Sequence, residues 1–363
     1  MIPFFDATRK TKKEKGEILS AVRNVLDSGR FVMGEKMANF EKEFSSYLGV
    51  SFGVGVNSGT DALKIALRSL GIKEGDEVIT VSNTATPTVS AIREIGAIPV
   101  FTDIDEYFTM KVSGLPRKIS KKTKAIVPVH LYGHPADMEE IMKFARENNL
   151  FVVEDCAQSA GAEIGGKKVG SFGNASAWSF YPTKNLSACG DGGMITTKSK
   201  EIAEKSAMLR MYGMKGTYFS HVEGWNSRLD EIQSAILSIN LKYLDKRNQR
   251  RIEIAGQYIS KIKNPAIILP KKRPETKHVF HLFVARTKKR DKLTEYLKEK
   301  SIGMGIHYPF PVHLQKAYEF LGYKEGSLPE TEKVAKEILS LPIFPELTDE
   351  EIEYIIKEIN NFK

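Results

Sequence analysis

The sequence is poor in cysteine and has no long apolar run. Only two cysteines occur among 363 residues, Cys156 and Cys189, and nothing near them has a paired metal-ligand spacing. This excludes a disulfide framework and fits a reducing compartment. No apolar stretch approaches the roughly 18 residues that a membrane-spanning helix needs. Residues 1–6 lack the apolar core of a signal peptide, so we expect a cytoplasmic protein.

The composition is that of an ordinary globular protein with a basic balance. A length of 363 residues is enough for two domains with proper cores. The net charge of +9 has two explanations. Basic clusters at 10–13, 271–273 and 288–290 fit solvated tips and connections, whereas a summed positive field would attract polyanions such as nucleic acid.

Strand-like and helix-like segments alternate through the first half of the chain. Helical patterns cover 14–27, 35–48, 61–70, 88–95 and 138–147, and strand patterns cover 52–56, 77–81, 99–104, 125–132 and 150–154. Strands joined by helices pair in parallel through right-handed crossovers. We therefore expect an α/β sheet covered by helices on both faces, with ligands bound beyond the carboxyl ends of the strands.

The second half continues this alternation and adds a further unit. We expect a strand at 194–197, a helix at 201–211, a long helical run at 229–259, a strand at 279–285 and helices at 291–300 and 348–359. The long run leads toward a second, smaller α/β domain. The predicted organisation is an N-terminal arm at 1–12, a large domain at 13–245 and a small C-terminal domain at 246–363.

One lysine lies in a stretch that is unsuited to a helix. Lys184 follows the run Ser-Phe-Tyr-Pro-Thr and precedes three glycines at 190–193, which favour a closely packed loop. Upstream, the apolar strand at 150–154 leads to Asp155. A buried amine suits the aldehyde of pyridoxal 5′-phosphate (PLP), and a carboxylate suits its pyridine nitrogen. A solvated surface lysine and an acid that caps the next segment are the alternatives.

Six motifs in order resemble the DegT-like nucleotide-sugar aminotransferases, which are PLP enzymes of the aspartate-aminotransferase fold. The motifs lie at 58–63, 153–158, 179–185, 190–193, 224–231 and 306–309, and the resemblance runs from residue 2 to near the C-terminus. It implies the PLP-transferase fold of type I. The large domain then carries a mainly parallel sheet, and the small domain is C-terminal.

The resemblance assigns a role to each candidate residue. Lys184 would form the Schiff base with the cofactor and shuttle protons, and Asp155 would keep the pyridine nitrogen protonated. The other cofactor-binding candidates are Gly59, Thr60, Gln158, Ser179 and Asn226. The substrate-binding candidates are Tyr181, His307, Tyr308 and His313. Gln158 would bond the phenolic oxygen, and Asn226 would reach the phosphate from a neighbouring subunit, which requires a homodimer.

The phosphate site also follows from local structure. Residues 58–60 lie where a strand becomes a helix, and the free amides of a helix N-terminus bind anions. Plain N-capping by Ser58 or Thr60 is a compatible alternative. One departure from the family is visible at Ala85, where many relatives have an aromatic residue that stacks on the cofactor ring.

Two other groups have chemical interpretations that we disfavour. His130 and His134 have the spacing of a helical metal pair, but Gly133 and Pro135 oppose a helix there, so we expect no metal. Cys156 lies beside an acid that would raise the pKa of its thiol, which favours a packed residue over a nucleophile.

We expect an enzyme that moves an amino group from glutamate to a keto group of a sugar linked to dTDP or UDP. The run at 307–315 is more similar to relatives that act on 3-keto sugars than to those that act on 4-keto sugars. Two alternatives remain. Some relatives are PLP-dependent sugar dehydratases, but they have histidine in place of the lysine. A basic, non-enzymatic regulator that binds DNA is the other, although no helix-turn-helix or zinc module is visible.

Overall fold

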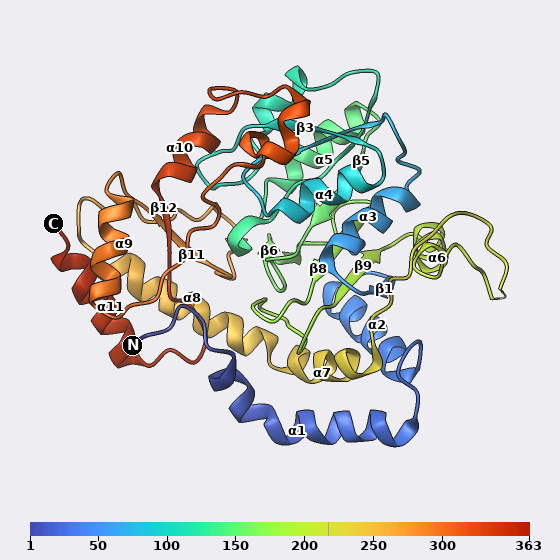
Figure 1. Ribbon diagram of the computed structural model, residues 1–363, viewed down its shortest axis with the longest axis horizontal. Helices are drawn as coiled ribbons and strands as arrows, with labels where there is room; N and C mark the ends of the chain where they lie inside the picture. Colours follow the sequence, from blue (N-terminus) through green and yellow to red (C-terminus); the bar gives the residue numbers. More distant parts are fainter. Residues whose placement is uncertain (217) are drawn as a thin grey trace.

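The computed structural model describes residues 1–216 and 218–363. Its largest sheet has seven strands, and Figure 1 shows helices packed around it. The strand order is β1-β9-β8-β5-β4-β2-β3. The strands are β1 (Phe52–Val56), β2 (Glu77–Val81), β3 (Ile98–Thr102), β4 (Thr123–Ile126), β5 (Phe151–Asp155), β8 (Ala175–Ser179) and β9 (Gly193–Thr197). This confirms the predicted α/β class.

The sheet is mainly parallel, as predicted, but one strand runs the other way. β3, β2, β4, β5 and β8 pair in parallel, so their carboxyl ends share one edge of the sheet. β9 is antiparallel to both β8 and β1. The strand that leaves the glycine-rich stretch therefore turns back between its neighbours and holds that stretch at the edge where ligands bind.

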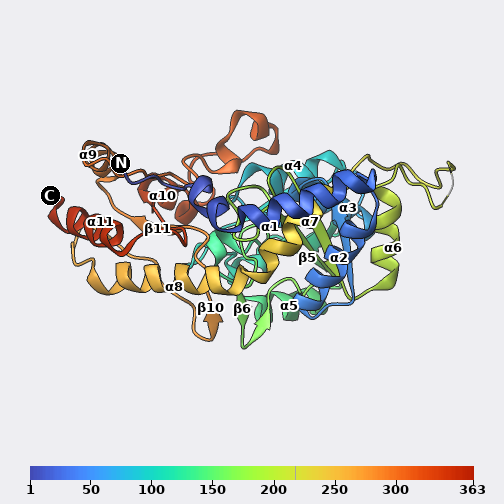
Figure 2. The same cartoon turned by 90° about the horizontal axis from the view of Figure 1, so that it is seen from below.

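Helices cover both faces of this sheet (Figures 1 and 2). Because side chains alternate along a strand, Val153 of β5 packs in the same core cluster as α3 (Gly59–Ser69), whereas Val152 packs with α5 (Met138–Glu147). The remaining helices around the sheet are α2 (Glu35–Leu48), α4 (Thr86–Glu94), α6 (Lys200–Leu209) and α7 (Glu231–Lys242).

The N-terminal arm is shorter than predicted. Helix α1 spans Ala7–Ser28, because Asp6 caps it by accepting hydrogen bonds from the amides of Thr8 and Arg9. Six residues remain extended rather than twelve. Within them, Ile2 forms a β-bridge with Ile302, so the arm reaches the C-terminal part of the chain.

The long helical run breaks at Tyr243. Helix α7 ends at Lys242, and α8 (Leu244–Lys261) continues into a second apolar core. That core contains β11 (Phe283–Arg286), β12 (Ile338–Leu341), α9 (Arg290–Glu299) and α11 (Asp349–Asn361). Figure 2 shows these elements at one end of an elongated molecule, with α8 running toward the sheet. The boundaries of the two domains stay a prediction.

Several shorter elements were not predicted or have other bounds. β4 ends at Ile126 instead of continuing to 132, and a 3₁₀ turn at Leu131–Gly133 follows. The unpredicted elements include β6 (Glu163–Ile164), β7 (Lys167–Lys168), β10 (Thr276–Lys277) and α10 (Pro329–Glu337). Of the helices in the described part of the chain, none has the length and apolar character of a membrane span.

Candidate active site

Asp155 is the last residue of β5, and its carboxylate is buried. Thr88 of α4 donates a hydrogen bond to Oδ2 at 2.8 Å, and the amide of Ala157 donates to Oδ1 at 3.1 Å. Burial raises the pKa of Asp155, while these bonds and the charge of Lys184 oppose the rise. The carboxylate thus lacks a neutralising contact and favours a nearby cation.

Lys184 follows β8 on a tight turn in which its amide donates to the carbonyl of Tyr181 at 2.8 Å. The side chain lines a cavity at the edge of the sheet. Burial lowers the pKa of Lys184 to about 8, and the charge of Asp155 acts in the opposite direction. A substantial fraction of the amine is therefore neutral near physiological pH, as a nucleophile requires.

The two charged groups face each other without direct contact. Each shifts the pKa of the other, yet among the ion pairs of the described residues none joins Lys184 to Asp155. An acid and an amine that act on each other through space, without forming an ion pair, both remain available to a ligand. A buried pair with no such purpose would be expected to close into an ion pair.

The predicted phosphate site lies where α3 begins. Ser58 caps the helix by accepting a hydrogen bond from the amide of Asp61 at 3.2 Å, and Gly59 and Thr60 form its first turn. Ser179, the last residue of β8, lies against this turn, because a Cβ atom on Gly59 would lie 2.6 Å from the Ser179 Cβ. The free amides and a hydroxyl thus converge, as anion binding requires.

Gln158 links the site to two tyrosines. Its Oε1 accepts a hydrogen bond from the amide of Tyr132 at 2.7 Å, and its Nε2 donates to the Tyr308 hydroxyl at 3.0 Å. Tyr132 has a positive φ of 60° and donates from its hydroxyl to the carbonyl of His307. This network ties the strand-end loops to the segment at 307–308, so Gln158 helps to position that segment.

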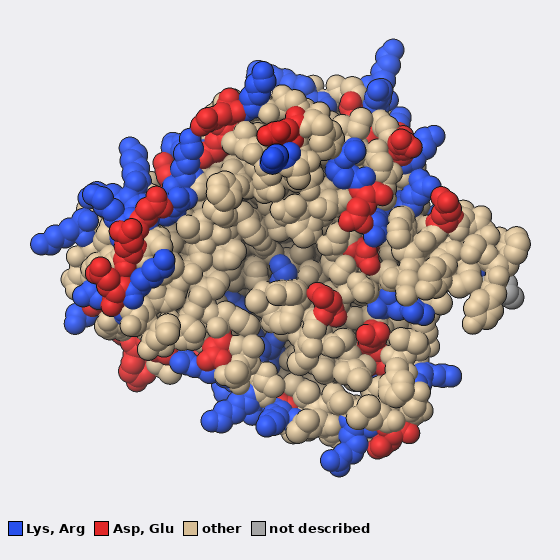
Figure 3. All heavy atoms as spheres, in the orientation of Figure 1, with Lys and Arg blue, Asp and Glu red and all other residues tan. Residues whose placement is uncertain are grey.

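Three of the predicted substrate-side residues line the Lys184 cavity, which has a volume of about 240 Å³: Tyr181, His307 and Tyr308. Figure 3 shows the face of the molecule hollowed near its centre, with basic atoms in the hollow. Burial first, and then the charge of Lys184, lowers the pKa of His307 to about 4. His307 is therefore a neutral hydrogen-bonding group at physiological pH.

Two predicted residues lie outside this cavity. His313 is buried, with Nδ1 2.7 Å from the Ser82 hydroxyl and Nε2 3.1 Å from Glu332 Oε1. Both of its ring nitrogens are occupied within the protein. Asn226 is exposed and lines a separate pocket together with Asn57, Asp191 and Arg228.

Sequence reasoning missed several residues that line the cavity, among them Phe4, Phe5, Arg251 and His281. Phe4 stacks on His307 with a centroid distance of 5.4 Å, so the N-terminal arm forms part of the wall. One signal was visible in the sequence. Arg251 is one of the polar residues among the buried positions of α8, which also include Leu244, Ile254 and Tyr258, and an apolar residue would be expected at such a position.

The structure brings together a possible metal-ligating group that differs from the predicted pair. Donor atoms of His130, Glu154 and Cys156 lie within 4.8 Å of one another. However, Glu154 already accepts hydrogen bonds from His130 at 3.0 Å and from three backbone amides at 170–173. Burial raises the pKa of the Cys156 thiol well above its usual value, which disfavours the thiolate that a metal needs.

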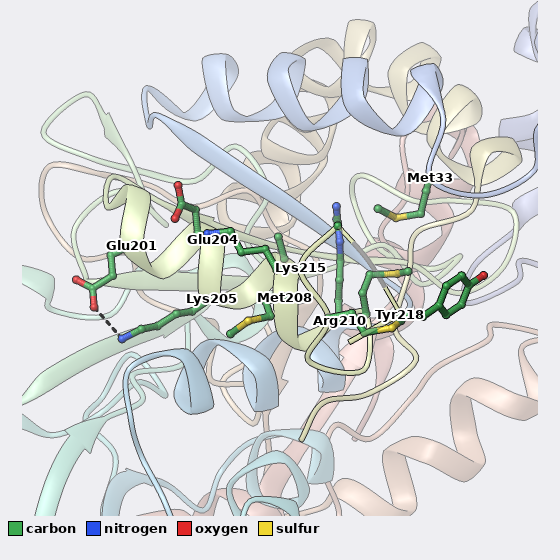
Figure 4. A pocket seen from close by; sticks show the side chains of 12 residues that line it. Met33, Glu201, Glu204, Lys205, Met208, Arg210, Lys215 and Tyr218 are labelled. Carbon is green, nitrogen blue, oxygen red and sulfur yellow. Dashed lines mark hydrogen bonds and ion pairs between the residues drawn. The ribbon is translucent and has the colours of Figure 1, made fainter. Parts of the chain in front are cut away.

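A larger pocket of about 660 Å³ lies beside α6 (Figure 4). Its walls carry the apolar side chains of Met33, Met208, Met211, Met214 and Tyr218. None of the predicted site residues lines it. Volume alone therefore does not locate the chemistry, which lies in the smaller cavity with the amine.

Lys184 of the smaller cavity, Asp155 and the first turn of α3 together fit PLP by the chemistry of their donor groups. A partly neutral amine suits the aldehyde, an unpaired buried carboxylate suits the pyridine nitrogen, and a helix N-terminus with a serine suits the phosphate. The glycines are also required. A Cβ atom on Gly193 would lie 2.2 Å from the Ser58 carbonyl oxygen, so the loop can approach the helix only with glycine there.

Fold and site together define an α/β PLP-dependent transferase. The family model of the DegT/DnrJ/EryC1/StrS aminotransferase family matches residues 12–360, and this chain belongs to that family. Solved relatives of the chain include forms with PLP and with the amine form of the cofactor, PMP. The chain is accordingly a PLP-dependent aminotransferase.

Named relatives match nearly the whole chain. The dTDP-3-amino-3,6-dideoxy-α-D-galactopyranose transaminase of Aneurinibacillus thermoaerophilus is 46% identical over 100% of this chain and 99% of its own. A pleiotropic regulatory protein of Geobacillus stearothermophilus is 44% identical over 99% and 98%. The structure of S. venezuelae DesV in complex with a ketimine intermediate is 43% identical, with a TM-score of 0.97 over 99% and 98%.

Proposed function

We propose that this enzyme transfers an amino group from glutamate to the keto group of a hexose linked to dTDP or UDP, with a 3-keto sugar as acceptor. The name of the Aneurinibacillus relative, which concerns a dTDP-linked 3-amino sugar, supports this choice. The positive net charge of the chain suits a substrate that carries a pyrophosphate.

The observation that carries the proposal is the opposition of Lys184 and Asp155 across one site. Bound PLP would supply an aldehyde and an electron-withdrawing ring. Lys184 would hold the cofactor through Nζ and, once released, would move a proton as a neutral amine. Asp155 would stabilise a positive charge on the ring nitrogen, and the amides of Gly59 and Thr60 with Ser179 would hold the phosphate.

The substrate-side residues would orient the acceptor sugar. Tyr181, His307 and Tyr308 offer hydroxyl and imidazole groups next to Lys184. Tyr308 and His307 are neutral, because burial raises the pKa of Tyr308 to about 12 and lowers that of His307 to about 4. Neutral hydrogen-bonding groups suit a sugar ring, which carries hydroxyl groups and no charge. The only support for a substrate-side role of His313 is that it lies in the same segment as His307 and Tyr308.

We also propose a homodimer in which Asn226 completes the partner's site. Asn226 lies away from the Lys184 cavity of its own chain and is exposed. Large apolar side chains are exposed in the same part of the molecule: Phe31, Val32, Tyr212, Tyr218, Phe219 and Val222. An exposed apolar patch of this kind is typical of a surface that a protein partner covers.

The reaction is tested with purified protein, PLP, ¹⁵N-glutamate and a panel of dTDP- and UDP-linked 3-keto and 4-keto sugars. We expect the label to appear on carbon 3 of one sugar, with release of 2-oxoglutarate. Loss of water from the sugar without transfer of label would instead indicate the dehydratase. A salt-sensitive gel shift with DNA at nanomolar protein, without any transfer, would indicate the regulator that the Geobacillus name suggests.

The shared site is tested by mixing two inactive variants. Lys184→Ala should abolish turnover, and Asn226→Ala should weaken cofactor binding strongly. If the sites are shared, mixed dimers contain one site with both native residues, and the mixture should regain about a quarter of the wild-type activity. Mixtures that stay inactive after subunit exchange would contradict the proposal.

A further inference from the structure

Three arginines are buried in the described part of the chain: Arg210, Arg247 and Arg251. Arg210 pairs with Glu41 at 2.6 Å, and Arg247 pairs with Glu14 at 2.9 Å. Arg251 forms no ion pair with any residue that the structure describes. A buried charge normally has a charged partner, since its loss of hydration is otherwise uncompensated.

The surroundings of Arg251 hold the guanidinium group in place but do not neutralise it. Its Nη1 donates to the carbonyl of Ile343 at 2.7 Å and, at longer range, to those of Phe280 and His281. Burial lowers the pKa of Arg251 to about 10, so it stays protonated at neutral pH. Glu346 acts on this pKa only through space.

Arg251 lines the same cavity as Lys184. After burial, the charges of Lys184 and Arg251 also lower the pKa of His281, and all three residues line this cavity. His281 is itself held by a contact of 3.1 Å between its Nδ1 and Asn185 Oδ1. The amine, the guanidinium group and this imidazole thus line one small space.

The size of this space favours a small anion over a nucleotide. The cavity has a volume of about 240 Å³, and pockets that enclose drug-sized ligands have roughly 300–1,000 Å³. Phe4 and Phe5 of the N-terminal arm contribute to its wall. A planar guanidinium group binds a carboxylate through two parallel hydrogen bonds.

We propose that Arg251 is the receptor for a carboxylate of the amino donor. This inference rests on the proposed function, because the donor must reach Lys184. The acceptor sugar brings no charge to this space, so a single cation would select the anionic donor in one half-reaction without hindering the neutral sugar in the other. Arg251 is therefore a specificity-determining residue for the donor.

The test measures binding of glutarate, a dicarboxylate without an amine, to the PLP-loaded enzyme by calorimetry. Arg251→Met should raise the Kd for glutarate about ten- to a hundredfold, because a charge-assisted hydrogen bond is lost. Arg251→Lys should lose less, since a point charge remains without the fork geometry. The single-turnover reaction with glutamate, followed by cofactor absorbance, should show the same rise in apparent Kd.

Arg247→Met is the matched control, because Arg247 is buried one turn earlier on α8 and lines no part of this cavity. It should leave glutarate binding within about threefold of wild type. All variants should bind dTDP as the wild type does. Unchanged glutarate binding in Arg251→Met, or a loss of dTDP binding instead, would overturn the inference. Glutarate binding needs no sugar. The test of Arg251 therefore stays valid even if no sugar in the panel accepts the amino group.

Discussion

Glu154 and Asp155 are neighbours in sequence and are both buried, yet their pKa values are shifted in opposite directions. Burial alone would raise the pKa of both side chains. Hydrogen bonds from His130 and from the amides of Gly170 and Gly173 nevertheless hold the pKa of Glu154 below its usual value. Asp155 has fewer such donors, and its pKa is raised. In one strand, therefore, the carboxylate of Glu154 accepts many hydrogen bonds, whereas that of the adjacent Asp155 accepts few.

The alternation of side chains along β5 accounts for this difference. Glu154 faces the layer of α5 and the loop at 170–173, where main-chain amides surround it. Because His130 Nδ1 accepts a hydrogen bond from Ala136, its Nε2 carries the proton and donates to Glu154. Asp155 faces Lys184 instead. A carboxylate whose bonding capacity is filled serves structure, and one left partly unfilled is available for a ligand.

If Asp155→Asn retained activity, the division of roles between Asp155 and Glu154 would be wrong. We expect turnover to fall about 10²- to 10⁴-fold, because a neutral amide no longer stabilises positive charge on the ring nitrogen. The free energy of unfolding should stay the same or rise, since the raised pKa of Asp155 means that its buried charge costs stability at neutral pH. Thr88 can turn its hydroxyl toward Thr84, 2.8 Å away, and accept from the new amide. Steady-state kinetics and thermal unfolding measure the two effects.

Glu154→Gln should show the reverse pattern. Replacing an acceptor of several hydrogen bonds with an amide should cost about 1–3 kcal/mol of unfolding free energy. Activity per folded molecule should change only a few-fold. Because the pKa of Glu154 is lowered on folding, its contribution is present above the unfolded value of about 4.5 and is lost as the pH falls through the folded value. Denaturant unfolding should thus show a smaller pH dependence below pH 4.5 in the variant; an unchanged dependence would contradict the assignment.

Much of the fold could be predicted wherever local signals are strong. The bounds of α2, β1, β2 and α5 match the predicted ranges, because glycines and N-caps mark their ends. β8 was missed, since small residues precede Trp178 and hide the alternation. The break at Tyr243 carries no proline or glycine to reveal it. β4 was overextended, because Pro128 and the positive φ of Tyr132 turn the chain away.

The residues of the site likewise differ in whether a local sequence pattern reveals them. Lys184 and Asp155 could be proposed from sequence, because each lies at a strand end or in a loop that has its own local pattern. Arg251, His281 and Phe4 reach the cavity from segments far away in the chain, and only tertiary packing brings them there. The separation of Asn226 from the Lys184 cavity likewise follows from the fold and not from its spacing.

The smallest predicted effect concerns the protonation of Lys184 in protein freed of its cofactor. Because the pKa of Lys184 is lowered to about 8, its rate of acetylation by acetic anhydride should rise about tenfold between pH 7 and pH 9 and then level off, as the neutral fraction does. Asp155→Asn removes the charge that opposes this lowering, so it should move the midpoint to lower pH. Glu154→Gln, on the other face of β5, should leave the midpoint in place. Mass spectrometry of the Lys184 peptide measures the rates. A shift of equal size in both variants would mean that the two carboxylates act on the amine alike, and their division into a structural and a chemical partner would be wrong.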